Sequence, residues 1–177
     1  MHNGNFSEHS AAVILLSGLP GSGKTTFAHT LREGLDFEHI ESDAIRRQIS
    51  PNPSYSFAES GAVFARVDAA ARRAISTGTH ALIDATNLTN RDRRRFYRLA
   101  SELGARLFAV RITAPDDLIR ERLRHPREGY SQAGLEVFER VRTRPQPFPG
   151  PSIAVDSRYS LVPAIDLLLR LIDDQEA

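Results

Sequence analysis

A glycine-rich loop between an apolar run and a helical pattern constrains this chain more than any other feature. Ala12–Leu16 is a short, continuous apolar run of the kind that forms a buried parallel strand. In residues 26–32, Phe27 and Leu31 lie four positions apart on one helical face, and Gly34 can end that helix. The loop between them reads Gly18-Leu19-Pro20-Gly21-Ser22-Gly23-Lys24-Thr25, which is the pattern G-x-x-x-x-G-K-[ST]. A strand, a loop and a helix in this order predict a phosphate-binding unit.

The residues of this loop have the chemistry that nucleotide phosphates require. Its glycines let successive backbone N–H groups point at phosphate oxygens, at the positive end of the following helix. Lys24 is the only lysine in a chain with 23 Lys and Arg residues. A compact ammonium reaches the β- and γ-phosphates where a planar guanidinium fits poorly, and Thr25 is expected to hold Mg²⁺. The residues expected to bind the nucleotide are Gly18, Leu19, Pro20, Gly21, Ser22, Gly23, Lys24, Thr25 and Thr26.

The remainder of the chain alternates short apolar runs with helical patterns. Because strands that alternate with helices form a parallel sheet covered on both faces, the expected fold class is α/β. Residues 11–177 are expected to form a single domain, and residues 1–10 a disordered tail. The further strands expected are 39–42, 81–83, 107–112 and 153–155. The further helices expected are 44–49 with Ser42 or Asp43 as its cap, 59–76, a helix capped by Asn90 that continues to 103, 114–123, 135–141 and 161–172.

Composition argues against several classes of protein. The chain has no cysteine, which rules out a disulfide framework, a thiolate metal site and a thiol nucleophile. Its six histidines show no close pairing at ligand spacing, so we interpret them as surface or core residues and expect no zinc. The apolar runs are far below membrane-spanning length and no signal pattern is present, which favours a cytoplasmic location. A net charge of +1 neither requires nor excludes an anionic polymer as partner.

Three aspartates, Asp43, Asp84 and Asp156, follow predicted strands, at the sheet edge where α/β proteins bind ligands. Asp84 ends an apolar run in the manner of a Walker B carboxylate that binds the metal or its waters, although a capping or turn aspartate is the alternative. Asp43 could take the proton of an acceptor hydroxyl, and its alternative is the N-cap of the next helix. Arg46 lies one helical turn further on and could face the same site.

Four segments of the chain resemble those of one group of enzymes. They are the loop 18–26, the segment 42–46, the segment 83–88 and the helix end 120–122. In these segments the chain is similar to the P-loop kinases of the polynucleotide 5′-hydroxyl kinase and zeta-toxin-like group, which are AAA-type predicted kinases, and the similarity spans Val13 to about Arg127. The resemblance implies a P-loop NTPase three-layer fold, a five-stranded parallel sheet of order 2-3-1-4-5 and a small arginine-bearing lid. Segment 83–88 looks most like the polynucleotide kinases.

The resemblance also implies roles for individual residues. The aspartate that matches Asp43 is the general base, and the arginine that matches Arg46 contacts the acceptor side. Arginines of the lid contact the transferred phosphate. We assign this role to Arg122 and Arg127, with Arg124 in reserve, and a solvated arginine cluster is the alternative.

A second group of arginines lies on the helix that continues to residue 103. It consists of Arg91, Arg93, Arg94, Arg95 and Arg98. Such a run could bind nucleic-acid phosphates. Because arginine replaces lysine throughout this chain, we interpret the run instead as the exposed face of an ordinary helix. Tyr55, Phe57 and Tyr130 could line the acceptor site.

Together these features predict a kinase that binds ATP or GTP with Mg²⁺ and transfers the γ-phosphoryl group to a hydroxyl. The acceptor is a nucleic-acid 5′ end or, as the alternative, a small metabolite or antibiotic. A nucleotide-dependent binding switch with slow hydrolysis is a further alternative. The pairing of Asp43 with Arg46 favours the kinase, because a switch needs no acceptor base. We expect no membrane association and infer no stable protein partner.

Overall fold

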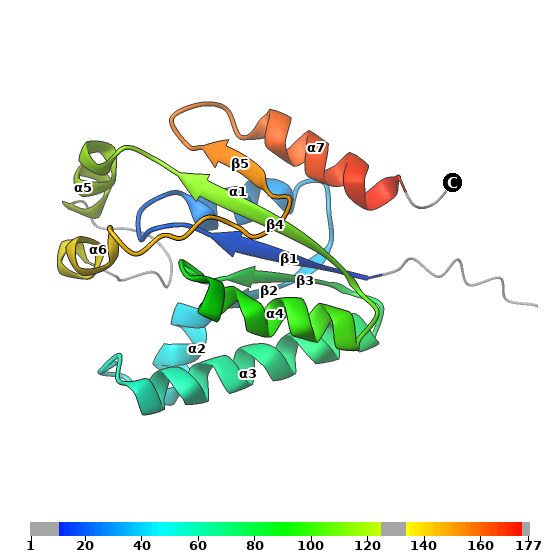
Figure 1. Cartoon of the computed structure of the whole chain (residues 1–177), viewed down its shortest axis with the longest axis horizontal. Helices are drawn as coiled ribbons and strands as arrows, with labels where there is room; N and C mark the ends of the chain where they lie inside the picture. The colour runs from blue at the N-terminus through cyan, green and yellow to red at the C-terminus, as the bar shows by residue number, and fades with distance from the viewer. Residues whose placement is uncertain (1–10, 125–133, 175–177) are drawn as a thin grey trace, which may run out of the picture.

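A five-stranded parallel sheet forms the centre of the molecule (Figure 1). The computed structural model describes residues 11–124 and 134–174. The strands are β1 (Ala12–Ser17), β2 (Phe37–Glu41), β3 (His80–Asp84), β4 (Arg106–Thr113) and β5 (Ile153–Asp156). Their order is β2-β3-β1-β4-β5, which confirms the α/β class and the order that the family resemblance implied. The apolar run that predicted β1 is the central strand, and all six of its residues are buried.

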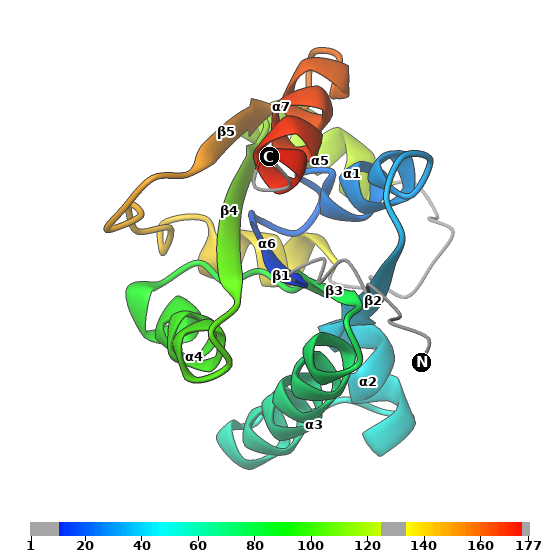
Figure 2. The same cartoon turned by 90° about the vertical axis from the view of Figure 1, so that its right-hand side faces the viewer.

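Helices cover both faces of the sheet, which gives three layers (Figure 2). Alternate residues of β1 point to opposite faces, so Ile14 and Leu16 share a core with α1 and α7, whereas Val13 and Leu15 share one with α3 and α4. Helices α5 and α6 lie beyond the carboxyl ends of the strands (Figure 1). The helices are α1 (Lys24–Leu31), α2 (Ser42–Ile49), α3 (Phe57–Ser76), α4 (Asn90–Glu102), α5 (Asp116–Arg124), α6 (Leu135–Val141) and α7 (Val162–Asp173).

Two helix caps differ from those that the sequence predicted. Helix α2 begins at Ser42 with Glu41 at its N-cap, and no side chain caps it, so the prediction of Ser42 or Asp43 as the cap was wrong. The strand before it ends one residue earlier than predicted, and the backbone turns directly into the helix. Helix α4 is capped by Thr89 instead of Asn90. Thr89 and Asp92 form a reciprocal capping box, which satisfies two backbone donors where an Asn90 cap would satisfy one.

The arginine run on α4 is not the uniformly exposed face that the sequence indicated. Arg93 is 1% exposed. Its guanidinium donates to Asn90 Oδ1 at 2.7 Å. It also donates to the backbone carbonyls of Gln146 and Pro147, both at 2.9 Å, and lies 4.0 Å from the ring centroid of Phe148. The interpretation was wrong for Arg93 because the proline-dense segment before β5 folds back over α4, a contact between parts of the chain distant in sequence.

This buried arginine makes a testable contribution to stability. Arg93→Ala is expected to lower the free energy of unfolding by about 1–3 kcal/mol, because charge-assisted hydrogen bonds and a stacked ring are lost together. Arg94 is exposed and adjacent, so Arg94→Ala is the matched control and should change that free energy by less than about 0.5 kcal/mol. Denaturant titration of both variants measures the difference. Equal, small changes would show that the fold does not depend on the Arg93 contacts.

Within residues 11–124 and 134–174, no helix is both long enough and apolar enough to cross a membrane.

Three sequence predictions fall outside these ranges. They concern the tail 1–10, the lid residue Arg127 and the acceptor-site residue Tyr130.

Candidate active site

A cavity of about 1340 Å³ opens at the carboxyl ends of the strands. It is lined by the loop and α1 on one side, by α2 and α3 on another, and by α5 and α6 on the side beyond the sheet. A parallel sheet brings its strand ends together at this edge, which is where α/β proteins bind ligands. The predicted site residues that line the cavity are Pro20, Gly21, Gly23, Lys24, Thr25, Thr26, Asp43, Arg46, Asp84 and Arg122.

The loop between β1 and α1 requires glycine at two positions. Gly23 forms the N-cap of α1 with φ of 103°, a left-handed conformation that a residue with a Cβ adopts only under strain. A Cβ on Gly18 would collide with the carbonyl oxygen of Ile112 on β4, so the loop can lie against the sheet only with glycine there. Lys24 Nζ donates to the carbonyls of Gly18 and Leu19, both at 3.1 Å. The Lys24 ammonium is therefore held inside the loop, where it is expected to contact the nucleotide phosphates.

Asp84 lies at the base of the cavity in contact with Thr25. Thr25 Oγ1 donates to Asp84 Oδ2 at 3.1 Å, and His39 Nε2 lies 3.3 Å from the same oxygen. Burial raises the pKa of the Asp84 carboxyl, but the hydrogen bond with His39, the charge of Lys24 and the hydroxyl of Thr25 together bring that pKa below its usual value. Asp84 therefore remains a carboxylate despite being buried.

The residues around Asp84 suit a magnesium ion. The Thr25 hydroxyl and the Asp84 carboxylate are adjacent oxygen donors, the ligand type that Mg²⁺ prefers. His39, Glu41 and Asp84 each bring one potential ligand atom within 4.8 Å of the others. The sequence interpretation left His39 and Glu41 out of the site. Only the pairing of Glu41 with Asp84 across β2 and β3 reveals that these side chains meet, since no spacing along the chain does.

Asp43 and Arg46 lie on the opposite side of the cavity, on the first and second turns of α2. Arg46 is 6% exposed, and its Nη1 donates to Glu59 Oε1 at 2.5 Å. Its guanidinium stacks over the ring of Tyr55, 4.6 Å from the centroid. Glu59 also accepts hydrogen bonds from the backbone N–H and hydroxyl of Ser54, at 2.7 and 2.8 Å. Helix α3 thus fixes the arginine beside the proposed base.

Glu59 is a further site residue that sequence reasoning missed. The hydrogen bond with Arg46, followed by that with Ser54, lowers the pKa of Glu59 to about 2. The pair therefore stays ionised at any pH at which the protein is expected to work. Tyr55 and Phe57 both line the cavity, and their place at an acceptor site stays a prediction.

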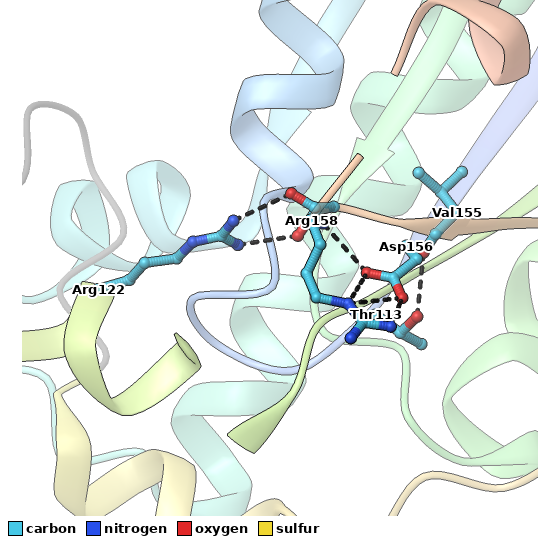
Figure 3. A network of polar contacts seen from close by, with 6 residues as sticks. Thr113, Arg122, Val155, Asp156 and Arg158 are labelled. Atoms are coloured by element: carbon cyan, nitrogen blue, oxygen red, sulfur yellow. Dashed lines mark hydrogen bonds and ion pairs between the residues drawn. The ribbon is translucent and has the colours of Figure 1, made fainter. Parts of the chain in front are cut away.

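Arg122 of α5 reaches the segment that follows β5 (Figure 3), and it also contacts the glycine-rich loop. Its Nη1 donates to the carbonyl of Gly21 at 3.2 Å and to Ser157 Oγ at 2.8 Å, and its Nη2 donates to the carbonyl of Ser157 at 3.0 Å. Ser157 is itself held by a hydrogen bond from its N–H to the carbonyl of Thr113 at 2.9 Å. The guanidinium therefore lies directly beside the glycine-rich loop.

Two other residues weighed from the sequence lie away from the cavity. The carboxylate of Asp156, the third strand-end aspartate, pairs with the exposed Arg158 at 2.6 Å (Figure 3). Arg124, the reserve lid arginine, is exposed at the end of α5. Of the described lid arginines weighed from the sequence, Arg122 is the one that reaches the loop.

A family model described as an AAA domain matches residues 13–148. The chain belongs to the AAA domain family. The match begins in β1 and covers the glycine-rich loop, both cavity aspartates and Arg122. Among curated protein sequences, none matches this AAA domain.

Solved structures share the fold of this AAA domain at low sequence identity. Mycobacterium tuberculosis APS kinase CysC in complex with AMPPNP and APS has a TM-score of 0.71 and 16% identity over 93% of this chain and 98% of that one. Chaetomium thermophilum Kti12 in complex with ADP-AlF3 has a TM-score of 0.71 and 20% identity over 93% and 99%. A gluconokinase from Sinorhizobium meliloti 1021 has a TM-score of 0.67 and 18% identity over 94% and 96%. The fold is therefore that of the P-loop kinases, and the matches do not single out the polynucleotide kinase group.

Proposed function

We propose that this AAA domain is a kinase that transfers the γ-phosphoryl group of ATP, with Mg²⁺, to a hydroxyl. The observation that carries the proposal is the cavity itself, which has a phosphate-binding loop at one end and a carboxylate backed by a buried arginine at the other. A nucleotide hydrolase needs only the first of these. The second supplies a base and a positioning group for an acceptor.

Each residue has a distinct role in the proposed reaction. The loop amides and Lys24 bind the phosphates. Thr25 and Asp84 would hold Mg²⁺, which would neutralise phosphate charge when bound. Asp43 accepts the proton of the attacking hydroxyl, while Arg46 holds the acceptor side of the cavity in place. Arg122, joined by Arg127, stabilises the charge of the transferred group. Positioning of the reactants and electrostatic stabilisation of the transition state account for nearly all of a protein's contribution to phosphoryl transfer.

The acceptor is either a small molecule or a nucleic-acid 5′ end. The solved structures with this fold include an APS kinase, a gluconokinase and a sugar kinase, which supports a small molecule. The resemblance of residues 83–88 to polynucleotide kinases supports the other acceptor. Incubation of the protein with γ-labelled ATP or GTP, Mg²⁺ and a panel of hydroxyl acceptors tests the proposal. Transfer of label to any hydroxyl supports the kinase, whereas release of phosphate that no acceptor stimulates would support a binding switch.

Asp43→Asn is expected to lower the transfer rate by about two to four orders of magnitude, because a positioned base is removed without a change in shape. The affinity for ATP with Mg²⁺ should stay the same, since Thr25 and Asp84 hold the metal. Rapid-quench kinetics measure the rate, and equilibrium binding of a non-hydrolysable nucleotide measures the affinity. A collapse in affinity with an unchanged rate at saturating ATP would make Asp43 a metal-binding or structural residue.

A further inference from the structure

Helix α4 contributes Arg95 to the wall of the cavity. The environment of this arginine differs from that of Arg46. Arg91 and Arg95 are one turn apart on α4, so both face the cavity. The guanidinium of Arg95 stacks on the ring of Phe64 from α3, 4.1 Å from the centroid. A stacked guanidinium is held in one plane and keeps its edge available for hydrogen bonds.

Arg95 forms no hydrogen bond or ion pair with residues 11–124 or 134–174. Its Nε is buried without a partner. By contrast, Arg46 in the same cavity is paired with Glu59. Burial lowers the pKa of Arg95 from its ordinary value, which reflects the cost of a charge withdrawn from water. A partly buried cation that forms no ion pair is a costly feature that a bound anion would offset.

The carboxylates of Asp92 and Asp68, whose charges act on Arg95, are both engaged, and Asp68 forms an ion pair with Arg72 at 2.7 Å. Asp92 Oδ2 accepts hydrogen bonds from the N–H and the hydroxyl of Thr89, at 3.0 and 2.8 Å. It therefore serves the cap of α4. Asp43, the other carboxylate at this end, lies across the cavity on α2, where the proposed reaction uses it as the base.

Two further arginines line the cavity from the side of α6. Arg140 lies on α6 and Arg144 follows it, and both line the cavity. Within the described part of the chain, neither side chain forms an ion pair. Both are exposed, so each adds less than Arg95 on its own. Positive charge nevertheless gathers on two walls around the place that an acceptor would occupy.

We propose that the acceptor carries an anionic group, a carboxylate or a phosphate, and that Arg95 binds this group while the acceptor hydroxyl lies at Asp43. The proposal rests on the proposed kinase function and names the substrate class of the same cavity. A planar guanidinium fixed on Phe64 can donate two parallel hydrogen bonds to either kind of anion. Arg140 and Arg144 add attraction from the α6 side. A small organic acid, a small phosphate ester and the phosphodiester of a nucleic-acid end share this chemistry.

Matched acceptors and one matched pair of variants test the proposal. The acceptors are a sugar alcohol and its sugar acid, a nucleoside and its 3′-phosphate, and a 5′-hydroxyl oligonucleotide. The anionic member of a pair is expected to have a kcat/KM at least about tenfold higher, and Arg95→Gln should reduce kcat/KM for that member by about 10- to 100-fold, chiefly through KM. The neutral member should be unaffected. Arg98→Gln, at an exposed position one turn beyond the cavity wall, should leave both members unchanged.

A binding measurement separates failure of this proposal from failure of the kinase function. Calorimetric titration of inorganic phosphate into the protein with AMPPNP and Mg²⁺ bound should show a site that Arg95→Gln weakens and Arg98→Gln does not. If that site exists but no acceptor is phosphorylated, the kinase function fails and the anion site remains. The anion proposal fails, and the kinase function stands, if acceptors are phosphorylated without regard to charge. The same holds if Arg95→Gln lowers kcat/KM equally for the anionic and the neutral acceptor of a pair. If Arg95→Gln lowers kcat/KM for the oligonucleotide alone, the anionic group is a phosphodiester. If Arg95→Gln lowers kcat/KM for the small acids or esters, the acceptor is a metabolite.

Discussion

Lys24→Arg is expected to abolish phosphoryl transfer almost as completely as Lys24→Ala. The ammonium lies inside the loop, within hydrogen-bond distance of the carbonyls of Gly18 and Leu19. A guanidinium is broader and planar, so it cannot take that place without displacing the loop, even though its charge is the same. The reaction requires the charge at one point between the β- and γ-phosphates, and a displaced charge stabilises the transition state poorly.

Single-turnover assays with γ-labelled nucleotide measure this effect, once a substrate has been found with the acceptor panel. Circular dichroism should confirm that both variants remain folded, because the lysine side chain lies on the cavity wall and not in the core. Arg32, an exposed position near the end of α1, offers a control as Arg32→Lys, which should retain full activity. Near-normal turnover by Lys24→Arg would contradict the role that we give to the lone lysine.

Arg122→Ala is expected to lower the rate of the chemical step by about three to five orders of magnitude, the range that arginines in contact with a transferring phosphoryl group contribute. Nucleotide affinity should change far less, because an interaction strongest in the transition state appears in the rate constant. Arg127→Ala is expected to act in the same direction. Pre-steady-state kinetics of the chemical step, together with equilibrium nucleotide binding, measure both quantities.

Burial decides which arginine of α4 is a suitable control for Arg122→Ala. Arg93 resembles a surface residue in the sequence, but it is buried and bonded to the segment before β5. Arg98 is exposed on the same helix and is the suitable control, with an expected change of well under tenfold for Arg98→Ala. If alanine at Arg122, Arg127 and Arg98 lowers the rate of the chemical step by equal, small factors, the lid arginines are solvated surface residues.

The parts of the fold that sequence reasoning predicted are those encoded locally. An apolar run, a glycine loop and an apolar helical face occupy adjacent positions, so β1, the loop and α1 could be placed within a few residues. The strand order is set by how crossovers pack on the sheet, which no local pattern encodes, and here it came from the family resemblance. Helix starts were less accurate because capping depends on backbone geometry, as the Thr89 and Asp92 box shows.

The site divides in the same way. Lys24, Thr25 and Asp84 were predicted because each lies in a motif or at a strand end. His39 and Glu59 were missed, since their partners lie 45 and 13 residues away along the chain. The difference in environment between Arg93 and Arg95, two positions apart on one helix, depends on which neighbours pack above them: a returning segment covers the first, and the ring of Phe64 supports the second.

The attachment of the segment after α6 to α4 fixes this segment at one point. Gln146 accepts from the N–H of Asn90 through its side chain and donates to the carbonyl of Leu88 through its backbone, at 2.8 Å in each case, and Arg93 donates to its carbonyl. The chain is thus held at Gln146 against the loop that leaves β3. Helix α6 itself is held against α5, because Glu139 pairs with Arg120 at 2.7 Å and Phe138 is fully buried. Arg140 and Arg144 therefore lie between two fixed points, so their guanidinium groups change position by rotation of the side chains while the backbone that carries them stays in place.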